Sequence, residues 1–178
     1  SMMTWLLWCL LIAPATAGGA CWLLHSARAI LLFVAAAVVA VTAVAVAVAV
    51  AVFAHGPVEA GAGWLYVDAL SAYHLVLLHM VFCLSSIYAC SYFRRETSFG
   101  IAEARRFGPL WLGSLSAMVL VLVSNNLGIV WVGIEATTLL TAFLICIHVS
   151  PASLEATWKY LIMCSVGVAF AFIGTLLV

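Results

Sequence analysis

Residues Asn126–His148 read NLGIVWVGIEATTLLTAFLICIH, a mostly apolar stretch with a single acid, Glu135, near its middle. A transmembrane helix needs about 20 consecutive, mostly apolar residues, and this stretch is long enough. A charged side chain at that depth costs about 2.5–3.5 kcal/mol on the insertion scale, so intramembrane acids usually mark ion or proton pathways. The stretch therefore predicts a membrane-spanning helix that carries a functional carboxyl group.

The composition of the whole chain agrees with a membrane location. Of its 178 residues, 68% are hydrophobic and 7% are charged, and the formal net charge is zero. Soluble domains have about 25% charged residues, so we expect a protein that lies in the lipid bilayer. The chain has no excess of basic residues, so we expect no nucleic-acid partner. The six cysteines stand singly, without a CxxC or Cys/His cluster, so we expect neither a metal site nor a redox cofactor in this chain.

Apolar segments of spanning length predict an all-α, polytopic membrane protein with six transmembrane helices in one domain over residues 1–178. The expected helices cover about residues 4–24, 29–53, 68–93, 109–124, 126–148 and 153–178. The first segment ends in small residues like a signal peptide, but it lacks a leading positive charge, and we interpret it as a retained helix. The second alternates Ala and Val like a strand, yet an isolated strand in lipid would leave its backbone groups unpaired, which favours a helix.

The fourth and fifth helices are separated only by the polar sequence Ser124–Gly128 (SNNLG). Two amides followed by a glycine favour a turn, so we predict two helices of ordinary length here. Asp68 precedes the third helix and suits an N-terminal cap. The small residues of the sixth segment suit close helix packing; they are Gly167, Ala169, Ala171 and Gly174.

The positive charges predict the orientation. In a six-helix zigzag, every arginine and Lys159 fall on one side of the membrane; the arginines are Arg28, Arg94, Arg95, Arg105 and Arg106. The positive-inside rule makes that side cytoplasmic. We therefore expect a multi-pass protein of the cell inner (plasma) membrane with both termini outside.

Three other polar residues are weighed with Glu135 as candidates for proton translocation. Lys159 follows Glu155 at the i, i+4 spacing, so the two can pair on one helix face. The simpler interpretation is a lysine that extends to the membrane surface and forms a surface salt bridge. His79 lies near mid-membrane in the third helix and could relay protons, because histidine titrates near neutral pH. A histidine hydrogen-bonded within the bundle is an equally good interpretation. Glu155 and His79 are the weaker candidates.

Two segments resemble a known family. The sequence Trp131–Leu139 (WVGIEATTL), followed by Leu154–Leu161 (LEATWKYL), is similar to helices five and six of antiporter-like, proton-conducting membrane subunits. These subunits occur in respiratory complex I, Mrp-type antiporters and group 4 hydrogenases. The sequence of these two segments is most similar to the hydrogenase-4 component F branch, and Val67–Ser71 resembles the start of the family's helix three.

The resemblance implies roles for individual residues. Glu135 matches the family's helix-five glutamate, part of the charge pair that drives proton movement, and Lys159 matches the lysine near the start of helix six. In the family, the principal partner of the glutamate is a lysine on helix seven. The expected helices here end with the sixth, so the resemblance implies one of two arrangements: the chain is a fragment of a longer subunit, or other membrane subunits supply helix seven onward. It also implies a hydrogenase or dehydrogenase peripheral arm as partner, which would hold the redox cofactors.

The sequence leaves three functional hypotheses. The first is a proton- or cation-translocating membrane subunit of a redox-driven complex, such as a membrane-bound hydrogenase or a complex I relative, with no catalytic centre of its own. In this hypothesis Glu135 carries the proton, and Lys159 modulates its protonation or passes protons on. The second is a structural membrane subunit that conducts nothing. The third is a free-standing cation/proton antiporter, although alternating access usually uses a second repeat that these helices do not supply.

Overall fold

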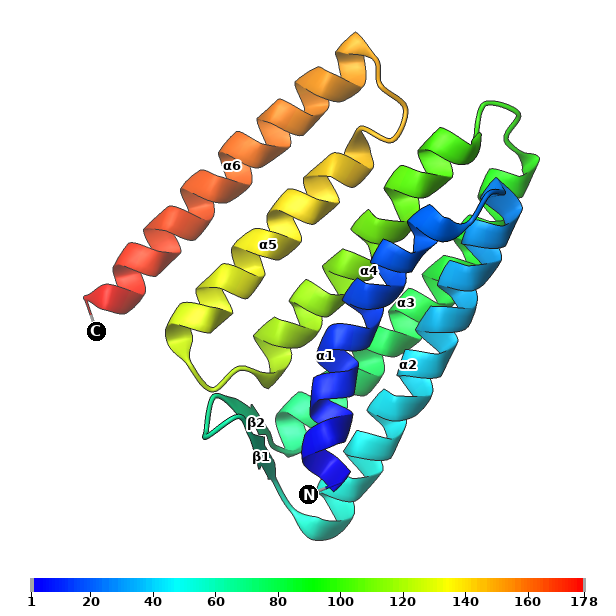
Figure 1. Ribbon diagram of the computed structural model, residues 1–178. Coiled ribbons are helices and arrows are strands. Elements are labelled where there is room, and N and C mark those ends of the chain that lie inside the picture. The colour runs from blue at the N-terminus through cyan, green and yellow to red at the C-terminus, as the bar shows by residue number, and fades with distance from the viewer. Residues whose placement is uncertain (1, 178) are drawn as a thin grey trace.

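The computed structural model describes residues 2–177, which form a bundle of long helices with one short hairpin (Figure 1). Six of these helices are long and apolar enough to cross a membrane. The all-α, six-helix membrane architecture predicted from the sequence is therefore confirmed. In chain order the elements are α1 (Met2–Ala20), the 3-10 turn η1 (Cys21–Leu23), α2 (Ala27–His55), β1 (Val58–Ala60), β2 (Leu65–Val67), α3 (Ala69–Arg95), α4 (Ile101–Val123), α5 (Leu127–Ile145) and α6 (Pro151–Leu176).

The packed core lies among the first four helices. The largest fully buried side chains include Leu7 and Leu10 of α1, Ile30 of α2, Leu75 of α3 and Leu112 of α4. Helix α5 packs against α4, and α6 packs against α5 as an outer layer (Figure 1). Of the described residues of α6, only Thr157 is buried. The α5–α6 pair therefore packs against a four-helix core through α5, and most of the surface of α6 is exposed.

Most helix bounds differ from the expected ones by a few residues, but the fourth helix was wrong by a larger margin. We expected it to begin near Pro109, with Arg105 and Arg106 in the preceding loop, whereas α4 begins at Ile101. The Glu103 side chain accepts a hydrogen bond from the Gly100 N–H at 2.9 Å, which caps the helix start. Charge alone indicated a loop, but arginines in the first turns of a helix can extend toward the membrane surface. The expected sixth helix ends at Val178, which lies outside the described residues.

The polar sequence between α4 and α5 is a turn, as predicted. Ser124 ends α4, and the Asn126 side chain caps α5 by accepting hydrogen bonds from the Gly128 and Ile129 N–H groups at 2.9 and 3.2 Å. The loop that we expected between residues 55 and 67 contains the β1–β2 hairpin instead. Asn125 binds this hairpin through its backbone N–H, which donates to the Trp64 carbonyl at 2.8 Å. The hairpin turn has positive φ at Gly61 and Gly63, which glycine adopts at little cost.

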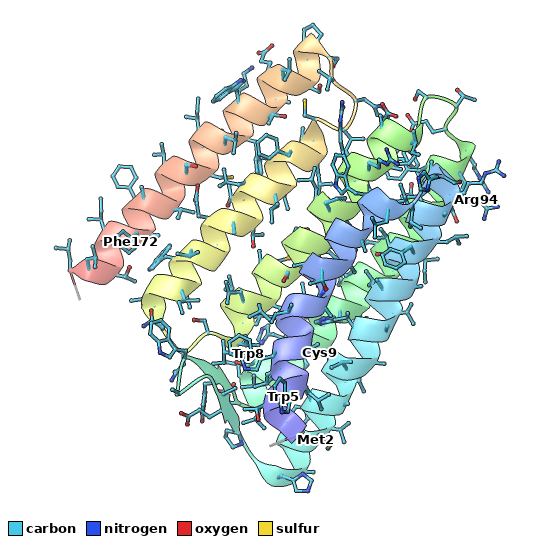
Figure 2. The ribbon with its side chains drawn as sticks, in the orientation of Figure 1. Met2, Trp5, Trp8, Cys9, Arg94 and Phe172 are labelled. Carbon is cyan, nitrogen blue, oxygen red and sulfur yellow. The ribbon has the colours of Figure 1, made fainter. Side chains whose placement is uncertain are left out.

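The opposite end of the bundle gathers the arginines, and we call it the arginine-rich end. Arg105 Nη2 donates to the Leu24 carbonyl at 3.1 Å, which joins the α1–α2 connection to α4. The His148 Nε2 lies 3.1 Å from Glu96 Oε1, which joins the α3–α4 loop to the α5–α6 loop. Figure 2 shows Arg94 at this end and Met2 at the other. The shared location is a structural fact, and the cytoplasmic orientation of this end stays a prediction.

Close helix packing uses different glycines from those expected. A Cβ added at Gly18 of α1 would lie 3.1 Å from Pro109 Cα, and one at Gly133 of α5 would lie 2.7 Å from Val121 Cγ2. By contrast, a Cβ at Gly167 or Gly174 would meet nothing within 4 Å. Within the described chain, the glycines of α6 therefore do not form the close helix contacts that we expected. The sequence shows where small residues are, but which helix face meets a neighbour depends on the fold.

Asp68 caps α3, and its replacement should lower stability in a pH-dependent way. Asp68 Oδ1 accepts a hydrogen bond from the Ser71 N–H at 2.7 Å, and this bond lowers the pKa of Asp68 below its ordinary value of 3.8. A carboxylate with a depressed pKa stabilises the fold above its unfolded pKa and loses that contribution as the pH falls through the folded value. We expect Asp68→Ala to lower the melting temperature of the detergent-solubilised chain at pH 7. The difference from the wild type should shrink below about pH 4. Asp68→Asn is the control, because asparagine keeps the cap without the charge. A wild-type-to-Ala difference that stays constant down to acid pH would contradict this account.

Candidate functional site

Glu135 lies midway along α5, partly buried at the interface with α6. About eight to ten residues separate it from either end of the helix, which places its Cα about 12–15 Å from each end at 1.5 Å per residue. The other acidic residues of the chain lie in loops, in the hairpin or in the first two turns of a helix; they are Glu59, Asp68, Glu96, Glu103 and Glu155. Glu135 is therefore set apart from them by its depth.

The hydrogen-bond partner of Glu135 comes from α6. Ser165 Oγ donates to Glu135 Oε1 at 3.2 Å. Within residues 2–177 the carboxylate forms no ion pair. A single neutral hydroxyl leaves most of the hydrogen-bonding capacity of a carboxylate unused. The carboxylate can therefore accept hydrogen bonds from a further donor, such as water or a cationic side chain from another helix.

A series of side-chain contacts holds α5 and α6 side by side in antiparallel register. The Thr141 and Tyr160 hydroxyl groups lie 3.2 Å apart, between the Glu135–Ser165 pair and the connection at the arginine-rich end. Cys146 Sγ lies 3.5 Å from Ser153 Oγ, next to that connection. Near the other end, the rings of Trp131 and Phe172 meet edge-on with centroids 5.6 Å apart. Figure 2 shows Phe172 on α6 at the end remote from Arg94. Polar pairs therefore lie along this interface from the α5–α6 connection to Glu135.

Lys159 does not contact Glu135. Its Nζ lies 2.5 Å from Glu155 Oε1, and both side chains are largely exposed, at 70% and 66%. Along α6, Lys159 precedes Ser165 by six residues, or about 9 Å. The Tyr160–Thr141 hydroxyl pair lies in this interval. The i, i+4 pairing expected for Glu155 and Lys159 is present, whereas any effect of Lys159 on Glu135 acts across a distance.

His79 is fully buried, and the structure places it at the α2–α3 interface rather than beside Glu135. Its Nδ1 lies 2.7 Å from the Leu75 carbonyl in the same helix, and Nε2 has no hydrogen-bond partner among the described residues. The Thr42 hydroxyl of α2 donates to the backbone carbonyl of His79 at 3.5 Å. The structure therefore does not bring His79 together with the other predicted site residues.

A different histidine shares a cavity with α5. His74 of α3 lines a cavity of about 490 Å³ together with Thr137 and Thr138 of α5. The rest of the lining is apolar, from α3, α4 and α5. Both threonine hydroxyls donate to carbonyls of their own helix, Gly133 at 2.9 Å and Ile134 at 3.1 Å. Backbone bonding of these hydroxyls is common in membrane helices.

The sequence-based reasoning missed Ser165 and Tyr160. Serine and tyrosine are unremarkable in an apolar helix, and no motif marks either of them. A usable signal was the short connection between the two helices, which makes them antiparallel neighbours. In such a hairpin, each residue of one helix lies beside a residue about equally far from the turn on the other. Counting outward from the Cys146–Pro151 connection leads from Glu135 to Ile162, which lies within one turn of Ser165.

The Glu135–Ser165 hydrogen bond should be measurable as a coupling energy. Hydrogen bonds between transmembrane helices contribute about 0.6 kcal/mol on average and at most about 1.7 kcal/mol. We expect a double-mutant cycle of Ser165→Ala and Glu135→Leu to give a coupling in that range, from SDS titrations of the folded chain. Leucine is used because glutamine would keep an acceptor for Ser165.

Thr175→Val is the matched control for this cycle, since the Thr175 hydroxyl bonds only to carbonyls of its own helix at 2.8 and 3.1 Å. We expect no coupling between Thr175→Val and Glu135→Leu. Additive effects of Ser165→Ala and Glu135→Leu would show that the hydrogen bond is absent in the folded chain.

Comparison with known proteins gives one informative match. The chain is 34% identical over 114 residues to the Hydrogenase-4 component F homolog of Methylacidiphilum infernorum (isolate V4), which covers 62% of this chain and 24% of that protein. The chain is related to the antiporter-like hydrogenase subunits. No family model matches it. The resemblance drawn from the sequence is thereby confirmed.

The match covers only part of the length of the relative. The aligned part of this chain corresponds to about a quarter of the length of the relative. A multi-pass membrane protein related to a hydrogenase component agrees with the six apolar helices. The role of Glu135 and of the residues around it rests on the geometry described above.

Proposed function

We propose that this chain is part of a membrane subunit of a group 4 hydrogenase-like complex and that Glu135 is its proton-binding carboxylate. The observation that carries the proposal is the position of Glu135: an acid midway along a membrane helix, bound by one neutral hydroxyl at 3.2 Å. Such an acid is costly to retain unless it serves an ion or proton pathway. The match to a hydrogenase component supports the kind of complex.

The polar pairs of the α5–α6 interface suggest the direction of proton transfer. The exposed Glu155–Lys159 pair lies nearest the arginine-rich end, the Tyr160–Thr141 hydroxyls follow, and Glu135–Ser165 lies deepest. Hydroxyl groups can both donate and accept a hydrogen bond, so they suit a chain of proton transfers completed by water. In this proposal protons exchange between Glu135 and the arginine-rich side along this interface.

The remaining steps need groups from partner helices. Helix α6 exposes almost its whole surface, including Trp158, Met163 and Phe170 at 64%, 76% and 71%. We propose that further membrane helices of the complex cover this face and bring a cation near Glu135. The positive charge would favour the ionised carboxylate, and its withdrawal would favour proton uptake. The peripheral, redox-active part of the complex would drive that change.

The complex itself is the first thing to test. We expect gentle extraction from the native membrane, followed by mass spectrometry, to show this chain together with hydrogenase or dehydrogenase subunits. A partner that supplies additional membrane helices should be present. Recovery of the chain alone or as a small homo-oligomer would refute the proposal and favour a free-standing transporter.

A further inference from the structure

A groove at the arginine-rich end combines an apolar wall with two cationic side chains. It has a volume of about 470 Å³ and lies between η1, the first turns of α4 and the end of α5. Trp22, Leu110, Phe143 and Val149 supply apolar lining, and Arg105 and Arg106 supply the charge. Figure 1 shows the end of α1, the start of α4 and the end of α5 at the same end of the bundle.

The charge in the groove is only partly used. Arg105 Nη2 donates to the Leu24 carbonyl at 3.1 Å, but its Nε is buried and has no hydrogen-bond partner among residues 2–177. Glu103 on the same helix accepts a hydrogen bond from the Gly100 N–H at 2.9 Å and also interacts electrostatically with Arg106, but no acid lines the groove itself. The buried Nε is closed to a ligand in the groove, but both arginines line the groove, so a ligand with acceptor oxygens would be favoured here.

The apolar lining shows what kind of anion fits. Trp22, Phe143 and Val149 are 61%, 54% and 63% exposed. Trp22 and Phe143 lie at the end of a membrane-spanning segment, and Val149 lies in the α5–α6 connection. Tryptophan is enriched at this depth, where the lipid head groups meet the hydrocarbon. A free anion would use the arginines and leave the apolar lining exposed, whereas a phospholipid would use both.

We propose that this groove binds one anionic phospholipid of the adjacent leaflet. The phosphate group would accept hydrogen bonds from Arg105 and Arg106, and an acyl chain would lie along Leu110, Phe143 and Val149. Arginine suits this role because its guanidinium group presents several donors to phosphate oxygens at once. The inference is independent of the proton-binding role of Glu135.

Native mass spectrometry can test the groove with defined lipids. The chain would be purified in detergent with equal amounts of phosphatidylglycerol and phosphatidylcholine that carry the same acyl chains. We expect the wild type to retain phosphatidylglycerol preferentially. An arginine near an anionic lipid surface favours binding by about fivefold, so Arg105→Gln/Arg106→Gln should weaken retention roughly thirtyfold. Arg94→Gln/Arg95→Gln removes the same charge outside the groove and should leave retention unchanged.

Two further variants keep the test decisive if the double variant misfolds. Arg106→Gln alone preserves the Arg105–Leu24 hydrogen bond and should weaken retention about fivefold. Val149→Trp leaves both arginines in place but fills the groove, and it should also reduce retention. Excess inorganic phosphate should not displace the lipid.

Three results would overturn the proposal. Equal retention of the two lipids by the wild type would show an apolar groove without head-group selectivity. An equal loss in Arg94→Gln/Arg95→Gln would assign the effect to the overall charge of this end. Displacement by inorganic phosphate would indicate a site for the free anion.

Discussion

Replacing Glu135 with glutamine should abolish proton translocation by the assembled complex. Glutamine has nearly the same size and can still accept the hydrogen bond from Ser165, but it cannot bind and release a proton. The expected result is complete loss of redox-driven acidification in membrane vesicles, measured with a pH-sensitive dye. Electron transfer from the redox donor should continue, at least when the membrane is made permeable to protons.

The matched control for this experiment is Glu155→Gln. It removes the same charge from a side chain that is 66% exposed and already paired with Lys159. Exposed ion pairs contribute about 0–1 kcal/mol, so we expect this variant to retain most of its translocation. Glu135→Asp, which keeps an ionisable group, should retain part of it.

Full translocation by an assembled Glu135→Gln complex would favour the alternative of a structural subunit that conducts nothing. Assembly can be checked separately on native gels, so a failure to assemble would not be mistaken for a failure to pump. If Glu155→Gln abolished translocation while Glu135→Gln did not, the proton-binding residue would be Glu155 near the arginine-rich end rather than Glu135 at mid-helix.

The residues that sequence reasoning located well are those whose local chemistry decides their structure. The Ala/Val alternation of α2 forms a helix because lipid offers no partner for unpaired backbone groups. Asn126 ends the α4–α5 turn because its side chain can cap a helix. The depth of Glu135 follows from counting residues along an apolar segment.

The features that sequence reasoning missed depend on contacts between segments. The partner of Glu135 is set by how α6 lies on α5, and apolar periodicity does not specify that register, since both helices are apolar around most of their surface. Lys159 pairs with Glu155 one turn away, as the i, i+4 spacing predicted, and its effect on Glu135 stays a prediction. The sequence also does not show which glycine packs against a helix of the same chain, because Gly133 and Gly167 look alike in sequence and, of the two, only Gly133 meets another helix here.

The different surroundings of Gly133 and Gly167 predict that a larger side chain destabilises the chain at Gly133 but not at Gly167. A Cβ at Gly133 would lie 2.7 Å from Val121 Cγ2 and 3.3 Å from the Ala117 carbonyl oxygen of α4. The valine side chain is stiff about χ1, and the carbonyl belongs to a helix backbone, so α5 would have to move. We expect Gly133→Val to lower the free energy of unfolding of the detergent-solubilised chain by about 1–3 kcal/mol, as overpacked cores do. SDS titration would measure it.

Gly167→Val is the control, because the same change of residue in α6 meets nothing within 4 Å. Both substitutions alter helix propensity equally, so the difference between the variants isolates the contact of α5 with α4. In the isolated chain, Gly167→Val should therefore leave stability almost unchanged, and an equal loss in both variants would contradict the packing shown here. In the assembled complex the expectation for Gly167 reverses if partner helices cover α6, because a new side chain would then stand in an occupied interface. A variant that is harmless in the isolated chain but impairs assembly would place those partners on the open face of α6, opposite the face that carries Ser165 toward Glu135.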